Sequence, residues 1–192
     1  MATITILGKG NMGQAIAQIA TRGGNTVEVL DSTDQARPVT GDIVVLAVPY
    51  PAVAQILAER PGQFDGRIVV DITNPLNFET FDSLVVPADG SAASEIATQL
   101  PGAKVLKAFN TNFAATLASG TVGDQVPTTV LVAGDDADAK AALIGVVSAG
   151  GVKAIDAGAL KRARELEAIG FLQLTLAAGE QLPWTAGFGV IA

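Results

Sequence analysis

The chain has 192 residues and a formal net charge of −7, and it contains neither cysteine nor histidine. The missing thiol and imidazole groups exclude disulfides, thiolate nucleophiles and sulfur- or histidine-ligated metal sites, so no metal site is expected. Lysine and arginine are few and spread thinly, so no basic face for a nucleic acid is expected either. An enzyme of this composition does little proton transfer or relies on Asp, Glu, Lys or Tyr50.

The length suits one domain with a small appendage, and no segment has the pattern of a targeting signal or a membrane span. The start Met1-Ala2-Thr3 does not combine a basic region with a long apolar run, as a signal peptide does. No run reaches the roughly 18 apolar residues that cross a bilayer. The sequence therefore predicts a soluble cytoplasmic protein with no membrane partner.

Short β-branched runs alternate with helical patterns along the chain. Strands are expected at residues 3–7, 26–30, 42–48, 67–72, 104–109, 128–133 and 152–155. Helices are expected at residues 11–21, 53–59, 91–100, 139–149 and 160–182, followed by a glycine-rich apolar tail at 183–192. Strands that alternate with helices are typical of a parallel sheet covered on both faces. The predicted fold is α/β, a Rossmann-type doubly wound and mainly parallel sheet with a C-terminal helical extension.

Two units are expected on either side of Asp156. Residues 1–156 are predicted to form a dinucleotide-binding Rossmann domain, and residues 157–192 a helical extension. The apolar side chains between Leu166 and Leu176 are too many for a free surface helix. The extension is therefore expected to pack on the body of the protein and on the partner of a homodimer.

A glycine-rich loop follows the first predicted strand. Its residues match the pattern G-x-G-x-x-G and are Gly8, Lys9, Gly10, Asn11, Met12 and Gly13. The position between a strand and a helix is the context in which this pattern binds a dinucleotide. Gly8 permits the tight turn, Gly10 lets the backbone approach a pyrophosphate, and Gly13 lets helix and strand pack closely. The helix N-terminus offers free N–H groups to the phosphates.

The end of the second predicted strand bears on which dinucleotide is bound. Asp31 stands there, and an acidic residue at this point usually accepts a hydrogen bond from the adenosine ribose, which favours NAD(H). The hydroxyls of Ser32 and Thr33 are suited to a 2′-phosphate if Asp31 turns away. The residues alone leave NAD and NADP open.

Three other strand ends carry proline or amide residues, and ligands of open α/β sheets bind outside such ends. Candidate cofactor contacts are Ala47, Val48, Pro49, Asn74 and Pro75. Candidate contacts to a second small molecule, the acceptor, are Tyr50, Asn110 and Thr111. Amide and hydroxyl groups both donate and accept, which suits a carboxamide or the edge of a heterocycle. Simple turn chemistry is the alternative explanation of the proline-rich peptides.

Segments along nearly the whole chain resemble one known family. They are residues 4–13, 44–51, 69–77, 104–117 and 128–134. They are similar to the deazaflavin-dependent NADP oxidoreductases of the coenzyme F420 type, and the same module resembles the cytoplasmic reductase domain of the STEAP metalloreductases. The most specific peptides are Val-Asp-Ile-Thr-Asn-Pro-Leu-Asn at 70–77 and Lys-Ala-Phe-Asn-Thr at 107–111.

The resemblance implies a Rossmann domain with a small C-terminal helical region, commonly dimeric, that holds NADP(H) at the glycine loop. The nicotinamide is implied near Val48-Pro49 and Asn74-Pro75, with a deazaflavin, where one is used, near the third strand end. Family members often follow the second strand with a small residue, a serine and a basic residue. This chain has Asp31-Ser32-Thr33 there instead.

The working hypothesis is direct hydride transfer between the nicotinamide of NAD(P)H and F420 or a flavin-type acceptor. Such a transfer relies on two rings held face to face, so the protein is expected to position the rings and to supply no catalytic acid or base. Two alternatives stay open. One is an NAD(P)H-dependent reductase of a small carbonyl or imine, with Tyr50 or Lys107 as proton donor. The other is a non-catalytic NADP(H)-sensing module.

Overall fold

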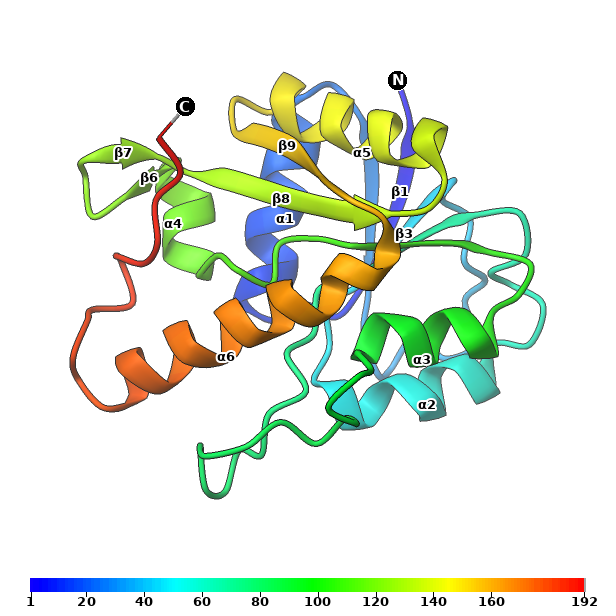
Figure 1. Cartoon of the computed structure of the whole chain (residues 1–192). Coiled ribbons are helices and arrows are strands. Elements are labelled where there is room, and N and C mark those ends of the chain that lie inside the picture. Colours follow the sequence, from blue (N-terminus) through cyan, green and yellow to red (C-terminus); the bar gives the residue numbers. More distant parts are fainter. Residues whose placement is uncertain (192) are drawn as a thin grey trace.

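A seven-stranded sheet runs through the computed structural model, which describes residues 1–191; Ala192, the last residue of the predicted tail, lies outside the described residues. The strands lie in the order β2-β1-β3-β4-β5-β8-β9 (Figure 1). Their bounds are β1 Thr3–Leu7, β2 Thr26–Leu30, β3 Ile43–Leu46, β4 Ile68–Asp71, β5 Lys104–Lys107, β8 Thr129–Gly134 and β9 Lys153–Gly158. The chain passes from β1 to β2 on one side and then crosses to β3 on the other side of β1. This strand order is the doubly wound arrangement that the sequence predicts.

Neighbouring strands are parallel except for one pair, β5 and β8, which is antiparallel. The chain leaves β5 at its carboxyl end and forms the short helix α4 (Ala114–Ser119) and a hairpin of β6 (Thr121–Val122) and β7 (Val126–Pro127). These short elements do not carry the chain back across the sheet, so β8 starts from the edge where β5 ends. The mainly parallel sheet is confirmed, while α4 and the hairpin are elements that the sequence analysis did not predict.

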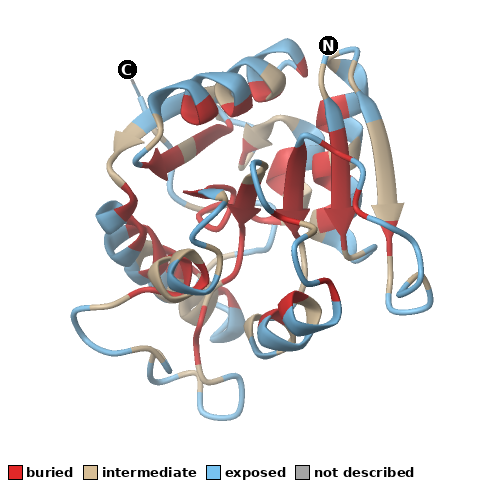
Figure 2. Cartoon of the chain, turned by 90° about the vertical axis from the view of Figure 1, so that its right-hand side faces the viewer, coloured by how far each residue is buried: buried red, intermediate tan, exposed pale blue. Residues whose placement is uncertain are grey.

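Helices cover both faces of the sheet. One face packs against α1 (Asn11–Arg22), α4 and α5 (Ala137–Ala149), and the other against α2 (Tyr50–Glu59), α3 (Ala92–Gln99) and the start of α6 (Ala163–Ala178). In the central strand β3, Ile43 and Val45 belong to the first core and Val44 and Leu46 to the second. A strand buried on both faces explains its continuous apolar sequence. Figure 2 shows the buried residues gathered in the central strands.

Two helices begin or end three or more residues away from the predicted positions. Helix α2 begins at Tyr50, three residues earlier than expected, because Pro49 takes the N-cap position and Pro51 fits the first turn, where its missing N–H costs no hydrogen bond. At the other end of the chain, a short 3-10 turn (Leu160–Arg162) precedes α6, and α6 ends at Ala178 rather than at residue 182. Gly179 caps that end.

The C-terminal helix α6 packs on the body of the protein. Its buried residues recur at helical spacing and are Ala163, Leu166, Glu167, Gly170, Gln173 and Ala177. Residue 156, the predicted boundary between the two units, lies inside β9, so the sheet continues past it. No helix within residues 1–191 is long and apolar enough to span a membrane.

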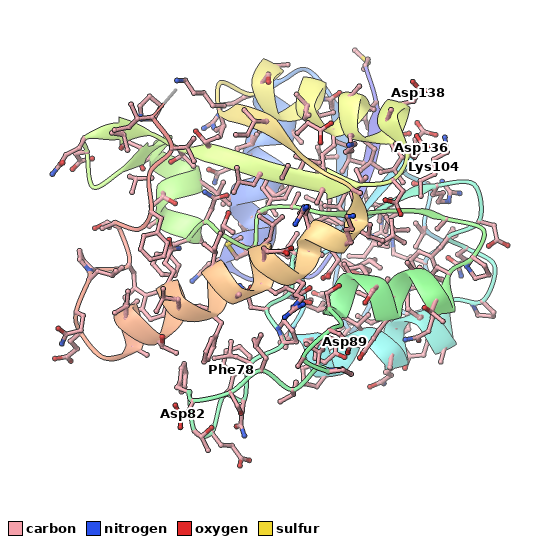
Figure 3. All side chains as sticks on the ribbon, viewed as in Figure 1. Phe78, Asp82, Asp89, Lys104, Asp136 and Asp138 are labelled. Atoms are coloured by element: carbon pink, nitrogen blue, oxygen red, sulfur yellow. The ribbon has the colours of Figure 1, made fainter. Side chains whose placement is uncertain are left out.

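Some apolar side chains stay exposed outside the core. Leu172 on α6 is 51% exposed, and Phe78, on the loop between β4 and α3, is 52% exposed. Figure 3 shows Phe78 and Asp82 on this projecting loop, well apart from Lys104 and Asp136, whose ion pair (3.1 Å) joins β5 to the start of α5. A homodimer through α6 stays a prediction.

Candidate active site

The glycine loop between β1 and α1 is folded so tightly that two of its glycines have no room for a side chain. Gly8 has a φ of +119°, and a Cβ there would lie 2.1 Å from the carbonyl oxygen of Ala47. A Cβ on Gly13 would lie 2.0 Å from the carbonyl oxygen of Gly8. Gly10 differs, because a Cβ there meets nothing within 4 Å. Gly8 and Gly13 therefore serve the packing of the loop, whereas Gly10 borders open space.

The N-terminus of α1 points its unpaired backbone groups at that space. Gly10 is the N-cap residue, and no side chain accepts a hydrogen bond from the first N–H groups of the helix. The first turn of α1 also holds no acidic residue. The free N–H groups and the partial positive charge of the helix end make this a place where an anionic group binds favourably.

A cavity of about 410 Å³ lies on one side of the loop, between the end of β2 and helix α2, and is called the β2-side cavity. Eight predicted cofactor contacts line it: Gly8, Lys9, Gly10, Asp31, Ser32, Ala47, Val48 and Pro49. These residues come from three separate strand ends, which the parallel sheet brings to one edge. Thr33 does not line the cavity, although it holds Asp31 in place.

Both carboxylate oxygens of Asp31 already have partners. One pairs with the ammonium group of Lys9, and the other accepts hydrogen bonds from the backbone N–H (2.7 Å) and the hydroxyl (2.6 Å) of Thr33. The hydrogen bond from Lys9, followed by those from Thr33, holds the pKa of Asp31 well below its ordinary value of 3.8. The same pair raises the pKa of Lys9. Asp31 thus stays ionised, and its charge is neutralised within the cavity.

A second cavity, of about 380 Å³, lies on the other side of the loop against α6 and is called the α6-side cavity. Asn11, Met12, Asn74 and Asn110 line it, as the sequence predicts for a binding site. The other lining residues were not predicted from the sequence: Ile72, Asn112, Phe113, Ala114, Ala115, Leu174 and Trp184. The cavity wall therefore combines four amide side chains with seven apolar residues.

Asn74 and Asn110, two of the asparagines that line this cavity, hold each other in place. The amide of Asn74 donates to the Asn110 carbonyl (2.9 Å), and the amide of Asn110 donates to Asn74 Oδ1 (2.9 Å) and to the Leu166 carbonyl (2.8 Å). The side-chain oxygens of Asn110 and Asn112 are buried and have no hydrogen-bond partner among residues 1–191. Unpaired buried acceptors are costly, so a ligand N–H group that reached these two oxygens would be stabilised there.

Gly170 of α6 makes this arrangement sterically feasible. A Cβ on Gly170 would lie 2.3 Å from Asn74 Oδ1 and 2.9 Å from the Asn110 carbonyl oxygen. The helix therefore approaches the asparagine pair as closely as only a glycine permits. An isolated glycine inside a predicted helix was the available sequence signal for such an approach.

We expect Gly170→Ala to lower the free energy of unfolding by about 1–3 kcal/mol, because the added methyl group overpacks the contact with Asn74. Gly145→Ala in α5 is the matched control, since a Cβ there meets nothing within 4 Å. We expect the free energy of unfolding of Gly145→Ala to rise by about 0.5–1 kcal/mol, because glycine is unfavourable inside a helix. Urea denaturation measures both differences, and equal stability of the two variants would contradict the close approach.

Besides Thr33, four other predicted site residues line neither cavity. Gly13 packs in the loop, and Pro75 is buried and accepts a hydrogen bond from the Val85 N–H (2.7 Å). Thr111 is buried, and its carbonyl accepts from Gln173 of α6 (3.3 Å). The remaining one is Tyr50, whose hydroxyl donates to Glu95 of α3. Burial and this hydrogen bond raise the pKa of Tyr50 well above its ordinary value of 10.

Lys107 also lies away from both cavities, in a buried ionic cluster. Its ammonium group contacts Asp71 Oδ2 (2.8 Å), Glu167 Oε1 (2.7 Å) and the Thr73 carbonyl (2.6 Å), and the three charged side chains are at most 1% exposed. Glu167 also accepts from the Ala92 N–H (3.0 Å) at the start of α3. Burial raises the pKa of Glu167 above its ordinary value of 4.5. The cluster joins β4, β5, α3 and α6.

Comparison with known proteins identifies the family. Residues 26–75 match the family model described as NADP oxidoreductase, coenzyme F420-dependent. The F420-dependent NADP reductase of Methanothermobacter thermautotrophicus is 34% identical over 167 residues, which cover 84% of this chain and 70% of that protein. The chain belongs to the F420-dependent NADP reductase family. This family consists of oxidoreductases, and the resemblance noted from the sequence segments is confirmed.

Three further comparisons support this assignment or the fold. The F420-dependent NADP reductase of Methanocaldococcus jannaschii is 34% identical over 144 residues, 73% of this chain but 63% of that protein. The chain thus spans less than two-thirds of that relative. Rat metalloreductase STEAP3 is 31% identical over 71% of this chain and 27% of its own length. A crystal structure from Arthrobacter sp. FB24, 23% identical, covers both chains fully with a TM-score of 0.84 and confirms the fold.

Proposed function

We propose that the protein transfers a hydride between the nicotinamide of NADP(H) and F420 or a flavin-type acceptor, as the names of its reductase relatives suggest. The observation that carries the proposal is the pair of cavities on either side of one glycine loop. A dinucleotide laid across the N-terminus of α1 has its adenosine half in the β2-side cavity and its nicotinamide half in the α6-side cavity.

The residues present fit a dinucleotide at both ends. Gly10 leaves open space beside the free N–H groups of α1, where a pyrophosphate is best stabilised. The unpaired side-chain oxygens of Asn110 and Asn112 suit the N–H donors of a carboxamide. Gly10 and the two asparagines are therefore the residues assigned to the pyrophosphate and to the nicotinamide.

The chemistry of the α6-side cavity favours transfer between rings. None of the residues that line it within the described chain carries a titratable side chain. With both ligands bound, the cavity would hold the two rings together for a hydride transfer. A transfer from NADPH would require the acceptor ring to take up one proton from solvent, and the reverse transfer would release one proton to solvent. The protein then only needs to exclude water and hold the rings in place.

The reductase of a small carbonyl or imine receives less support. Its two candidate proton donors do not line the α6-side cavity, since Tyr50 is bonded to Glu95 and Lys107 is enclosed by Asp71 and Glu167. A carbonyl oxygen that gains a hydride needs a proton from a group within hydrogen-bond reach. A donor that is already bonded to a carboxylate outside the cavity is poorly placed for that role.

The choice of NADP over NAD rests on Lys9. Its ammonium group neutralises Asp31, the residue that otherwise repels a 2′-phosphate, and the Lys9 side chain remains 68% exposed. The ammonium keeps further N–H donors for a phosphate oxygen. Ser32 lines the same cavity and adds a hydroxyl. Lys9 thus compensates for the basic residue that family members often have after the second strand.

We expect Lys9→Met to weaken NADPH binding about tenfold and to leave NADH binding within about twofold, because only NADPH carries the 2′-phosphate that Lys9 contacts. Isothermal titration at two salt concentrations measures both dissociation constants. The NADPH effect should shrink in high salt, since Lys9 is solvent-exposed. Lys153→Met, at an exposed position of β9, is the control and should change neither constant. An equal loss for both nucleotides would contradict the assignment.

The deciding test of the function is the anaerobic loss of NADPH absorbance with purified F420 as acceptor, followed by FMN as a second acceptor. Rapid and saturable loss with either ring supports the proposal. NADPH binding without turnover of any ring acceptor would overturn the hydride-transfer step and favour the sensing module. Failure to bind NADPH would overturn the assignment of the site itself.

A further inference from the structure

The C-terminal tail, residues 183–191, returns to the α6-side cavity after α6 has ended. Its backbone is tied to the body, since the Gly123 N–H donates to the Thr185 carbonyl (2.9 Å) and the Phe188 N–H donates to Gln173 Oε1 (2.9 Å). Figure 1 shows this red segment running from the end of α6 toward α4 and the β6–β7 hairpin. The tail is therefore a fixed part of the cavity wall.

Trp184 is the one tail residue that lines the cavity. Its ring packs on Phe113 with a centroid distance of 4.9 Å and an interplanar angle of 56°. The side chain nevertheless remains 51% exposed. Phe113 is buried, so one side of the indole is fixed against the body while about half of its surface stays open.

The composition of the cavity suggests what this open surface contacts. Its polar groups are the amides of four asparagines, and the rest of its wall is apolar and includes Met12, Ile72, Leu174 and Trp184. A volume of about 380 Å³ is within the range of small-molecule sites. A flat aromatic wall stabilises a flat aromatic ligand by stacking, whereas a small aliphatic carbonyl gains little from it.

We propose that Trp184 is a specificity-determining residue that stacks on the planar ring of the hydride acceptor. This inference rests on the proposed function and adds to it the residue that contacts the ring of the acceptor. Trp184 takes no part in the chemistry. It holds the acceptor ring in the same cavity as the asparagine side chains that are assigned to the nicotinamide.

Three variants of the full chain test the stacking role. Trp184→Leu removes the aromatic face, Trp184→Phe keeps a smaller one, and Phe188→Leu is the matched control on the same tail, at a residue that does not line the cavity. The acceptor's own fluorescence anisotropy gives its dissociation constant on protein saturated with NADP+, with F420 and FMN as probes. This reading needs no turnover. Steady-state kinetics with NADPH then give KM and kcat for each acceptor.

We expect Trp184→Leu to raise the dissociation constant and the KM of the ring acceptor about tenfold, with Trp184→Phe within about threefold of wild type. Phe188→Leu should match wild type, and all three should bind NADPH within about twofold of it. Unchanged acceptor binding in Trp184→Leu, or equal losses in Trp184→Leu and Trp184→Phe, would overturn the stacking role while the proposed function stands. Wild-type protein that binds NADPH but neither ring acceptor would overturn both.

Discussion

Gly10→Trp is expected to abolish NADPH binding while the protein remains folded. A side chain at Gly10 starts in open space and has an ordinary backbone φ of −66°, so the fold accepts it. The indole then fills the space beside the N–H groups at the start of α1, where the pyrophosphate is assigned. We expect the dissociation constant to rise at least about a hundredfold, which corresponds to about 2.8 kcal/mol.

Two other glycines make the Gly10 experiment specific. Gly145→Trp places the same side chain on the exposed surface of α5, away from both cavities, and should bind NADPH as wild type does. Gly8→Ala should instead unfold or strongly destabilise the protein, because its Cβ meets the Ala47 carbonyl at 2.1 Å and its φ is +119°. Thermal melting and equilibrium binding separate the three cases. Normal NADPH binding by Gly10→Trp would show that the nucleotide lies elsewhere.

Lys107→Met is expected to cost about 3–5 kcal/mol of stability, because it leaves the carboxylates of Asp71 and Glu167 buried without their cation. The free energy of unfolding of a domain is only about 5–15 kcal/mol, so this variant is expected to be marginally folded. Lys153→Met on exposed β9 is the matched control and should change stability by less than about 0.5 kcal/mol. Urea denaturation of both variants measures the difference, and equal stabilities would contradict the role of the cluster.

Glu167→Gln tests the same cluster if Lys107→Met does not fold, because it leaves one cation paired with one carboxylate. Burial raises the pKa of Glu167 above 4.5 in the folded state, so the folded protein binds its proton more tightly than the unfolded chain does. The stabilising effect of this proton is complete below pH 4.5 and is lost as the pH rises through the folded pKa. Relative to Glu167→Gln, the wild type should therefore lose stability as the pH rises from 4.5 through the pKa of Glu167 in the folded protein. A difference that does not vary with pH would contradict the shifted pKa.

The cluster also matters for the site, although it lies outside both cavities. Lys107 binds the Thr73 carbonyl, one residue before Asn74, and Glu167 lies on α6 one turn before Gly170. The ion pairs thus hold the two elements whose contact positions the asparagine pair. Sequence analysis named Lys107 as a candidate proton donor, but its burial between two carboxylates makes it a structural cation instead.

Local patterns in the sequence were sufficient to predict most of the fold. The apolar runs of the parallel strands and the glycine loop each depend on neighbouring residues, so they can be recognised without tertiary contacts. The start of α2 was predicted three residues too late, because Pro49 was taken only as the end of the preceding strand and not also as the cap of a helix. The glycine pattern likewise predicted the two roles later seen in Gly8 and Gly10, a tight turn and an open approach.

Only the tertiary structure decided which distant residues meet. Asn74 and Asn110 are 36 positions apart, and Ala92 and Glu167 are 75 apart, so no local periodicity indicates that they share a hydrogen bond. The antiparallel direction of β8 depends on where the chain re-enters the sheet after the β6–β7 hairpin. The sequence by itself determined a glycine loop on an α/β sheet, because loop geometry is local. The arrival of α6 and Trp184 at the cavity required the packed chain, because close contacts between remote segments arise only there.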